Sequence, residues 1–230
     1  MHINFMLFPK VVPLDLVGPY EVLGRVPGWT LDLVAADMEP VETDKGMAIL
    51  PTCTRETARP SDLLVIPGGA GSDIAMLDPD WLEFTRVHDA SAKYVFGICT
   101  GAFILGAAGL IKGRKVGSHW QARDLLEMFG ALPVDDRIVV DGKYYTSGGV
   151  SSGIDAALQV VADLEGLERA QLVQLAMEYD PGPPFPGGTP FTSPKSIVDA
   201  FLDANKERRI GRTKKVEEAA SRLQTSATSV

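Results

Sequence analysis

Cysteine is scarce in this 230-residue sequence, which has only two, Cys53 and Cys99. Two cysteines give little support for a disulfide framework, so a hydrophobic core is expected to hold the fold. No apolar run is long enough to span a bilayer. The amino-terminal residues also lack the basic region, apolar stretch and cleavage site of a signal peptide. Together these absences predict a cytoplasmic protein.

Positive charge is also in short supply, because 22 Lys and Arg stand against 30 Asp and Glu, for a net charge of -8. Nucleic-acid binding needs a clustered basic surface, so no nucleic-acid partner is expected. The one basic cluster, residues 206–215, is interpreted as the solvated face of a helix. The histidines His2, His88 and His119 show no metal-ligand spacing, and no GxGxxG or Walker pattern follows a strand. No metal or cofactor is therefore expected.

The alternation of strand-like and helix-like segments predicts an α/β fold, with a mostly parallel sheet and helices on both faces. Short apolar runs alternate with segments of helical spacing. The expected strands are 3–8, 29–36, 63–66, 94–98 and a hairpin within 137–145, and the expected helices are 15–26, 79–92, 100–108, 151–164 and 168–178. This domain is expected over residues 1–190. A C-terminal helical extension is expected over 191–230, with one polar helix from about Pro194 to near Leu223.

Cys99 stands where a strand pattern meets a helix pattern. The apolar run 94–98 leads directly into it, and small residues begin a helix after it. So tight a turn needs the glycines Gly97 and Gly101. It places the sulfur at the carboxyl edge of the sheet and at a helix N-terminus, which is expected to lower the pKa of the thiol. Cys99 is the predicted nucleophile, with buried packing as the alternative, whereas Cys53 is interpreted as a packing residue.

Two further segments are expected at the same edge of the sheet. A glycine pair, Gly68-Gly69, follows a buried strand, so the amides of Gly69 and Thr100 are candidates for an oxyanion site. Asp15 lies in the loop after the first strand. It either caps the following helix or, beside a thiolate, has a raised pKa and acts as a general acid.

Two more titratable residues are auxiliary candidates. Glu21 lies one or two turns along the helix after Asp15, which makes it a weaker choice for the acid. His119 follows a short strand, where it could be the base of a Cys–His dyad with Cys99. A structural histidine with its own hydrogen bonds explains the same pattern equally well.

These segments resemble a known family. The run 99–110, together with Ser118-His119-Trp120, is similar to the ThiJ/PfpI branch of the glutamine-amidotransferase-like superfamily. With the segments 14–19, 66–69, 147–155 and 175–185 added, nearly the whole chain resembles the isocyanide (isonitrile) hydratases of that branch. The Glu-Tyr-Asp-Pro loop that starts at Glu178 separates these hydratases from other members better than the cysteine turn does.

The resemblance implies a homodimeric, flavodoxin-like α/β sandwich without a cofactor. It implies a lyase, a hydro-lyase that converts an isocyanide and water to the N-substituted formamide through a thioimidate on Cys99. The implied roles are nucleophile for Cys99, general acid/base for Asp15, and a hydroxyl and amide beside the sulfur for Thr100. The small-molecule isocyanide is then the expected partner, with neither nucleic acid nor membrane.

Two other functions compete with this one. A related ThiJ/PfpI enzyme would hydrate a 2-oxoaldehyde in a glyoxalase-type reaction, which would depend on His119 and Glu21 rather than Asp15. A non-catalytic ligand-sensing domain is the other, because part of the chain also resembles the N-terminal half of some transcription regulators. Such regulators carry a DNA-binding domain of about a hundred residues downstream. Here the acidic charge and the forty residues after position 190 make a DNA-binding unit unexpected.

Overall fold

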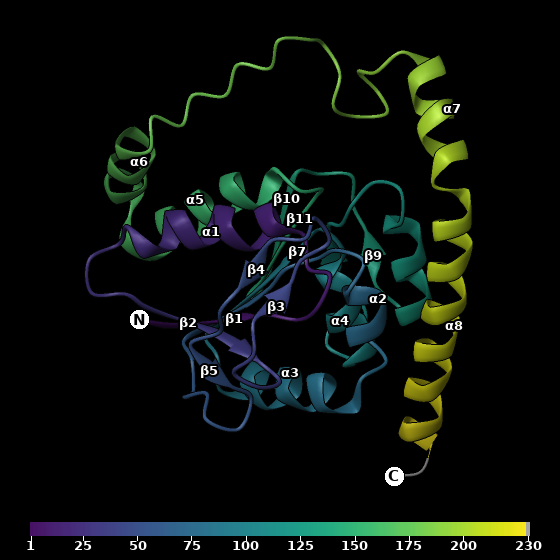
Figure 1. The fold of residues 1–230 in the computed structure, drawn as a ribbon, viewed down its shortest axis with the longest axis horizontal. Helices are drawn as coiled ribbons and strands as arrows, with labels where there is room; N and C mark the ends of the chain where they lie inside the picture. Colours follow the sequence, from purple (N-terminus) through teal and green to yellow (C-terminus); the bar gives the residue numbers. More distant parts are fainter. Residues whose placement is uncertain (229–230) are drawn as a thin grey trace.

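The computed structural model describes residues 1–228, built around a seven-stranded sheet (Figure 1). The strand order is β10-β11-β7-β6-β1-β2-β5. The strands are β1 (His2–Met6), β2 (Thr30–Ala35), β5 (Cys53–Thr54), β6 (Leu63–Ile66), β7 (Tyr94–Ile98), β10 (Ile138–Asp141) and β11 (Tyr144–Ser147). Neighbours pair in parallel except in the β10–β11 hairpin. The predicted mostly parallel α/β fold is confirmed.

Helices cover both faces of this sheet (Figure 1). One face carries α1 (Pro13–Gly24), α5 (Ser152–Glu165) and α6 (Leu167–Ala176), and the other carries α3 (Pro79–Ser91) and α4 (Ala102–Ala107). The central strand β6 is buried along its whole length, as expected for a parallel strand covered on both sides. Because β6 pairs with β7 in parallel, the carboxyl ends of these two strands meet at one edge of the sheet.

Shorter elements complete the carboxyl edge of the sheet. They are the hairpin of β3 (Val41–Glu42) with β4 (Ala48–Ile49), the short helix α2 (Ser72–Ala75), the paired strands β8 (Lys115–Val116) and β9 (Leu132–Pro133), and the 3₁₀-helix η2 (Arg123–Phe129). No helix within residues 1–228 is both long and apolar enough to cross a membrane.

The C-terminal part differs from the single polar helix predicted. It forms two helices, α7 (Lys195–Ala204) and α8 (Lys206–Thr228), and the last two residues of the predicted 191–230 extension lie outside the described part. The break falls at Asn205, whose side-chain amide donates to the Phe201 carbonyl (2.9 Å) and so caps α7. The helix α8 runs along the α/β body and contacts α4, η2 and α2 (Figure 1).

The basic cluster on α8 is therefore not a solvated face throughout. Arg209 forms an ion pair with Asp124 of η2, and Arg212 is only 5% exposed and pairs with Asp73 of α2. Side chains from one flank of the helix are thus used to attach it to the body. The solvated-face interpretation is wrong for Arg212, because helical spacing turns this position inward, a fact that residue type alone does not reveal.

Candidate active site

Cys99 lies at the sharp turn from β7 into a short 3₁₀-helix, η1 (Cys99–Gly101), which continues into α4. Its backbone φ is 54°, in the left-handed region. For a non-glycine residue this costs about 1–3 kcal/mol. A Cβ at Gly101 would lie 2.1 Å from the carbonyl oxygen of Ile66, so the turn requires glycine there. The Ser118 hydroxyl donates to the Cys99 carbonyl (2.6 Å) and supports the strained turn, a contact that the sequence did not predict.

The Gly68-Gly69 turn packs directly on this elbow. Gly69 has a φ of 127°, and its amide donates to the Thr100 hydroxyl oxygen (2.9 Å). The Ser72 hydroxyl lies 2.8 Å from the same oxygen. Since the Gly69 amide already has an acceptor, its predicted role as an oxyanion donor is not supported. The Thr100 amide instead faces the Cys99 sulfur, where it lowers the pKa of the thiol.

Asp15 lies in the first turn of α1 with no exposed surface. The cap of this helix is Val12, and no side chain caps it, so the alternative role of Asp15 as the helix cap is wrong. The Asp15 Oδ2 atom accepts a hydrogen bond from the Gly68 amide (3.0 Å). Its Oδ1 atom accepts no bond of normal geometry from residues 1–228, and the Cys99 thiol is close enough to influence the pKa of the carboxyl.

Burial is the largest cause of the pKa shifts of both Asp15 and Cys99. It raises the pKa of Asp15 to about 7. Burial, reinforced by the negative charge of Asp15, raises the pKa of the Cys99 thiol well above its ordinary value. The lowered thiol pKa expected from the sequence is therefore wrong, because α4 has only six residues and its N-terminus cannot offset complete desolvation. Above pH 7 the pair holds one proton, which Asp15 can take from the thiol.

Replacement of Gly68 by alanine is expected to damage this arrangement. The new Cβ would lie 2.5 Å from the Thr100 nitrogen and 2.8 Å from the Asp15 Oδ2 atom, so both groups must move. A displacement of about 1 Å at reacting groups costs on the order of 10² in rate. Steady-state kinetics of Gly68→Ala should show this loss. Gly182→Ala is the control, because a Cβ there meets nothing within 4 Å, and equal activity in both variants would contradict the prediction.

Of the two auxiliary candidates, His119 lies at the site and Glu21 does not. His119 lines the cavity at Cys99, and burial, followed by the charges of Arg212 and Arg208, lowers its pKa to about 4. A histidine with so low a pKa stays neutral and is a weak general base at neutral pH. Glu21 is exposed and pairs with Arg25 along α1, so it takes no part in the site.

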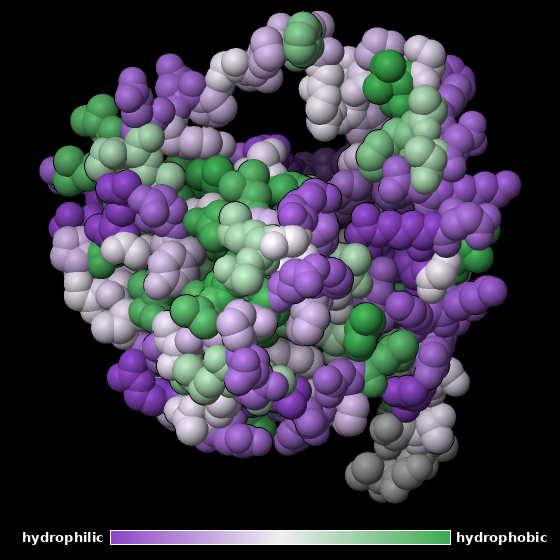
Figure 2. All heavy atoms as spheres, viewed as in Figure 1, coloured by the Kyte–Doolittle hydropathy of each residue, from purple (hydrophilic) through white to green (hydrophobic). Residues whose placement is uncertain are grey.

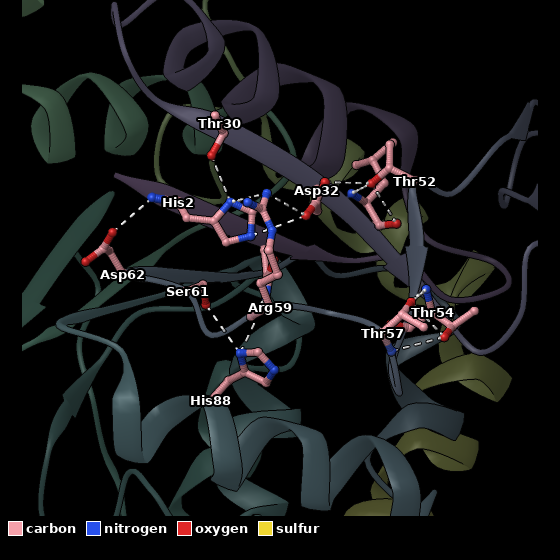
Figure 3. Close-up of polar contacts among 12 residues, drawn as sticks. His2, Thr30, Asp32, Thr52, Thr54, Thr57, Arg59, Ser61, Asp62 and His88 are labelled. Carbon is pink, nitrogen blue, oxygen red and sulfur yellow. Dashed lines mark hydrogen bonds and ion pairs between the residues drawn. The ribbon is translucent and has the colours of Figure 1, made fainter.

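The other two histidines do not line the Cys99 cavity: His2 begins β1, and His88 lies on α3 (Figure 3). His2 hydrogen-bonds the Thr30 hydroxyl (2.9 Å), and the His88 ring faces the Ser61 hydroxyl (3.4 Å). Cys53 packs against the core from the edge strand β5, as predicted. No group of three His, Cys, Asp or Glu residues within 1–228 could hold a metal ion.

A cavity of about 230 Å³ opens onto Cys99. Part of its wall is apolar, with Val12, Val150 and Phe201. The β3–β4 turn adds Asp44 and Lys45, and α8 adds Arg208 and Arg212. These charged residues could not be assigned to the site from the sequence, because they come from segments distant along the chain from the cysteine. A cavity of this size suits a small molecule.

Fold and site together define a class of protein: an α/β protein with a parallel sheet, a cysteine on a strained strand-to-helix elbow and a buried carboxyl beside it. The chain belongs to the DJ-1/PfpI family, whose model matches residues 1–163. The resemblance found in the sequence is thereby confirmed.

The chain is also similar to individual members of this family and to a regulator. The chain is 44% identical to the isonitrile hydratase of Pseudomonas putida, over 97% of this chain and 98% of that protein. The crystal structure of a ThiJ/PfpI family protein from Pseudomonas syringae superposes with a TM-score of 0.90 at 40% identity, covering 95% of this chain and 90% of that one. An HTH-type transcriptional regulator of Pseudomonas aeruginosa is 29% identical over 76% of this chain but only 53% of the regulator.

Proposed function

We propose that this protein is an isocyanide hydratase, which adds water to R–N≡C and releases the N-substituted formamide. The observation that carries the proposal is the buried Asp15 carboxyl next to Cys99, whose side chain lines a small cavity. The near full-length likeness to an isonitrile hydratase supports the same reaction. The net reaction transfers no electrons, so a nucleophile and a proton carrier are enough.

The first step forms a covalent bond to Cys99. Asp15 takes the thiol proton, and the resulting thiolate attacks the isocyanide carbon. Asp15 then delivers that proton to the same carbon, which gives the thioimidate S–CH=N–R on Cys99. The Thr100 amide faces the sulfur and stabilises its negative charge before the attack.

The second step uses water. The water oxygen bonds to the thioimidate carbon while the Asp15 carboxylate takes a proton from the water, and Asp15 then passes this proton to the nitrogen. The carbon–sulfur bond then breaks as the carbonyl forms, and the remaining proton returns to the Cys99–Asp15 pair. Asp15 therefore acts twice as a base and twice as an acid within one turnover.

The direct test is an assay for formamide from a small alkyl or aryl isocyanide, by chromatography or NMR. Formamide that appears at a rate proportional to enzyme concentration supports the proposal. A protein that binds isocyanides and produces no formamide overturns it, and a ligand-sensing role would then take its place.

The pH dependence follows from the raised pKa of Asp15. Below pH 7 both Asp15 and Cys99 are protonated, so no group can take the thiol proton, whereas above pH 7 the pair holds one proton. We expect kcat/KM to rise with pH to a plateau, with a midpoint at about 7. Initial rates over this range provide the measurement. A profile that falls through neutral pH contradicts the assignment.

Glyoxalase-type hydration of 2-oxoaldehydes has less support. In the interpretation above it would depend on His119 and Glu21. His119 has a pKa of about 4, and Glu21 is paired with Arg25 on an exposed face. His119 is therefore a weak base for that reaction, and Glu21 lies outside the site.

A homodimer is part of the proposal. Large apolar side chains are exposed on α6, on α7 and on the loop that joins these two helices (Figure 2). They are Leu167, Leu172, Leu175, Phe185, Phe191 and Ile197. An apolar surface of this kind is typical of a face that another chain covers.

Light scattering after gel filtration is expected to give a mass of twice 24.7 kDa. Leu175→Glu places a charge on the exposed apolar face and should shift the protein toward the monomer. Glu168→Lys, on the same helix at an already charged exposed position, is the control and should stay dimeric. A monomeric wild-type protein would remove the dimer from the proposal.

A further inference from the structure

Arg212 is held rigidly beside the site by a buried ion pair. Its Nε and Nη2 atoms donate to the two carboxylate oxygens of Asp73 (2.6 and 3.2 Å), and both side chains are at most 9% exposed. Asp73 directly follows Ser72, whose hydroxyl lies 2.8 Å from the Thr100 hydroxyl. The guanidinium is therefore fixed to the loop that builds the elbow, and a two-pronged pair of this kind has a defined orientation.

One nitrogen of this guanidinium, Nη1, is not used by the ion pair with Asp73. The Asp73 pair uses Nε and Nη2, whereas Nη1 takes part in no hydrogen bond within residues 1–228. Nη1 is also not among the buried side-chain atoms that lack a partner, and Arg212 lines the Cys99 cavity. Its positive charge lowers the pKa of both Cys99 and His119, which places it near both groups.

The reaction needs such a donor. Expulsion of the sulfur requires the added hydroxyl to lose its proton as the carbonyl forms, and this loss places negative charge on the new oxygen. The Gly69 amide is bound to the Thr100 hydroxyl, and the Gly68 amide is bound to Asp15. Of the three amides at the elbow, only that of Thr100 faces the sulfur. A fixed cation with a free N–H group is a stronger donor than a neutral amide.

We propose that Arg212 is a further catalytic residue, whose Nη1 donates a hydrogen bond to the oxygen that water adds to the Cys99-bound carbon. This role rests on the proposed isocyanide hydration. It acts in the second step, when the thioimidate is hydrated and the formamide is released. It also explains why α8 carries a buried arginine rather than an apolar residue at this position.

The test compares variants that keep the fold. Removing Arg212 alone leaves Asp73 buried and unpaired, which threatens folding. The double variant Asp73→Asn/Arg212→Met replaces both ionised groups at nearly constant shape, and Asp73→Asn alone is its matched background. Arg209→Met is the control for the docking of α8, because Arg209 attaches the same helix to Asp124 and does not line the cavity. Circular dichroism establishes that each variant is folded.

Each variant is mixed with one isocyanide, and intact-protein mass spectrometry follows the Cys99 adduct while chromatography follows the formamide. In the double variant the adduct should form and persist, with breakdown about 10²–10³-fold slower than in Asp73→Asn. Arg209→Met should show no accumulated adduct. Arg212→Lys, which keeps the charge but not the two-pronged geometry, should lie between these results.

Three outcomes would overturn the role. One is a double variant that loses activity without accumulating adduct, and another is breakdown less than tenfold slower than in Asp73→Asn. The third is an equal effect from Arg209→Met, which would assign the loss to the docking of α8. In all three cases the wild-type protein still makes formamide, so the proposed function stands. A wild-type protein that makes none overturns both.

Discussion

Cys99→Ser and Cys99→Ala are each expected to abolish formamide production while the fold survives. Serine lacks an acidity that Asp15 can use, and alanine has no nucleophile, so kcat should fall by about 10⁴-fold or more. Both replacements keep a Cβ at the φ of 54° and fill nearly the same space, so the elbow should persist. Formamide measured by chromatography, beside circular dichroism of each variant, provides the test.

Cys53→Ser is the matched control, because this second free cysteine lies on the edge strand β5 and does not line the Cys99 cavity. It should keep wild-type activity. A Cys99 variant with near wild-type turnover and an unchanged spectrum would falsify the nucleophile assignment. Loss of activity in Cys53→Ser alone would point to a different site.

Asp15→Asn should lower the rate by about 10²–10⁴-fold, the usual contribution of general acid–base catalysis. The amide oxygen of asparagine can still accept the hydrogen bond from Gly68, so the shape of the site is kept. What is lost is the group that takes the thiol proton and delivers it to carbon. In this variant kcat/KM should no longer rise with pH around pH 7, because that rise comes from the ionisation of Asp15. A purely structural role for Asp15 does not predict this change.

His119→Ala is the comparison for this variant. With a pKa of about 4, His119 is uncharged at neutral pH and is a weak base, so its loss should reduce the rate far less than Asp15→Asn does. Single-turnover rates on one isocyanide should be measured for both. An active Asp15→Asn beside an inactive His119→Ala would transfer the acid–base role to the histidine.

The parts of the fold that local sequence determines were predicted well. The strands 63–66 and 94–98 agree with β6 and β7 to the residue, because uninterrupted apolar runs end there at proline or at the cysteine turn. The meeting of Asp15, Gly68 and Cys99 also followed from the sequence, since the carboxyl ends of parallel strands share one edge.

The remaining features depend on distance along the chain or on burial. Ser118, Asp44 and Arg212 reach the site from segments distant along the chain, and nothing local in the sequence shows that they meet at Cys99. The direction of the Cys99 pKa was predicted wrongly because complete desolvation outweighs the amide of Thr100. The Gly69 amide was expected to be free, but the Thr100 hydroxyl occupies it, a pairing visible only in three dimensions.

The Arg212–Asp73 pair also sets an order of events during synthesis. Its partners are 139 residues apart, and α8 leaves the ribosome after every strand of the sheet. The sheet and the cysteine turn can therefore form first, with the cavity still open along the side that α8 later covers. Until α8 docks, the guanidinium of Arg212 is not yet beside Cys99. Arg212, the residue proposed to act last in the reaction, is therefore also the last to reach the site, through the docking of one C-terminal helix.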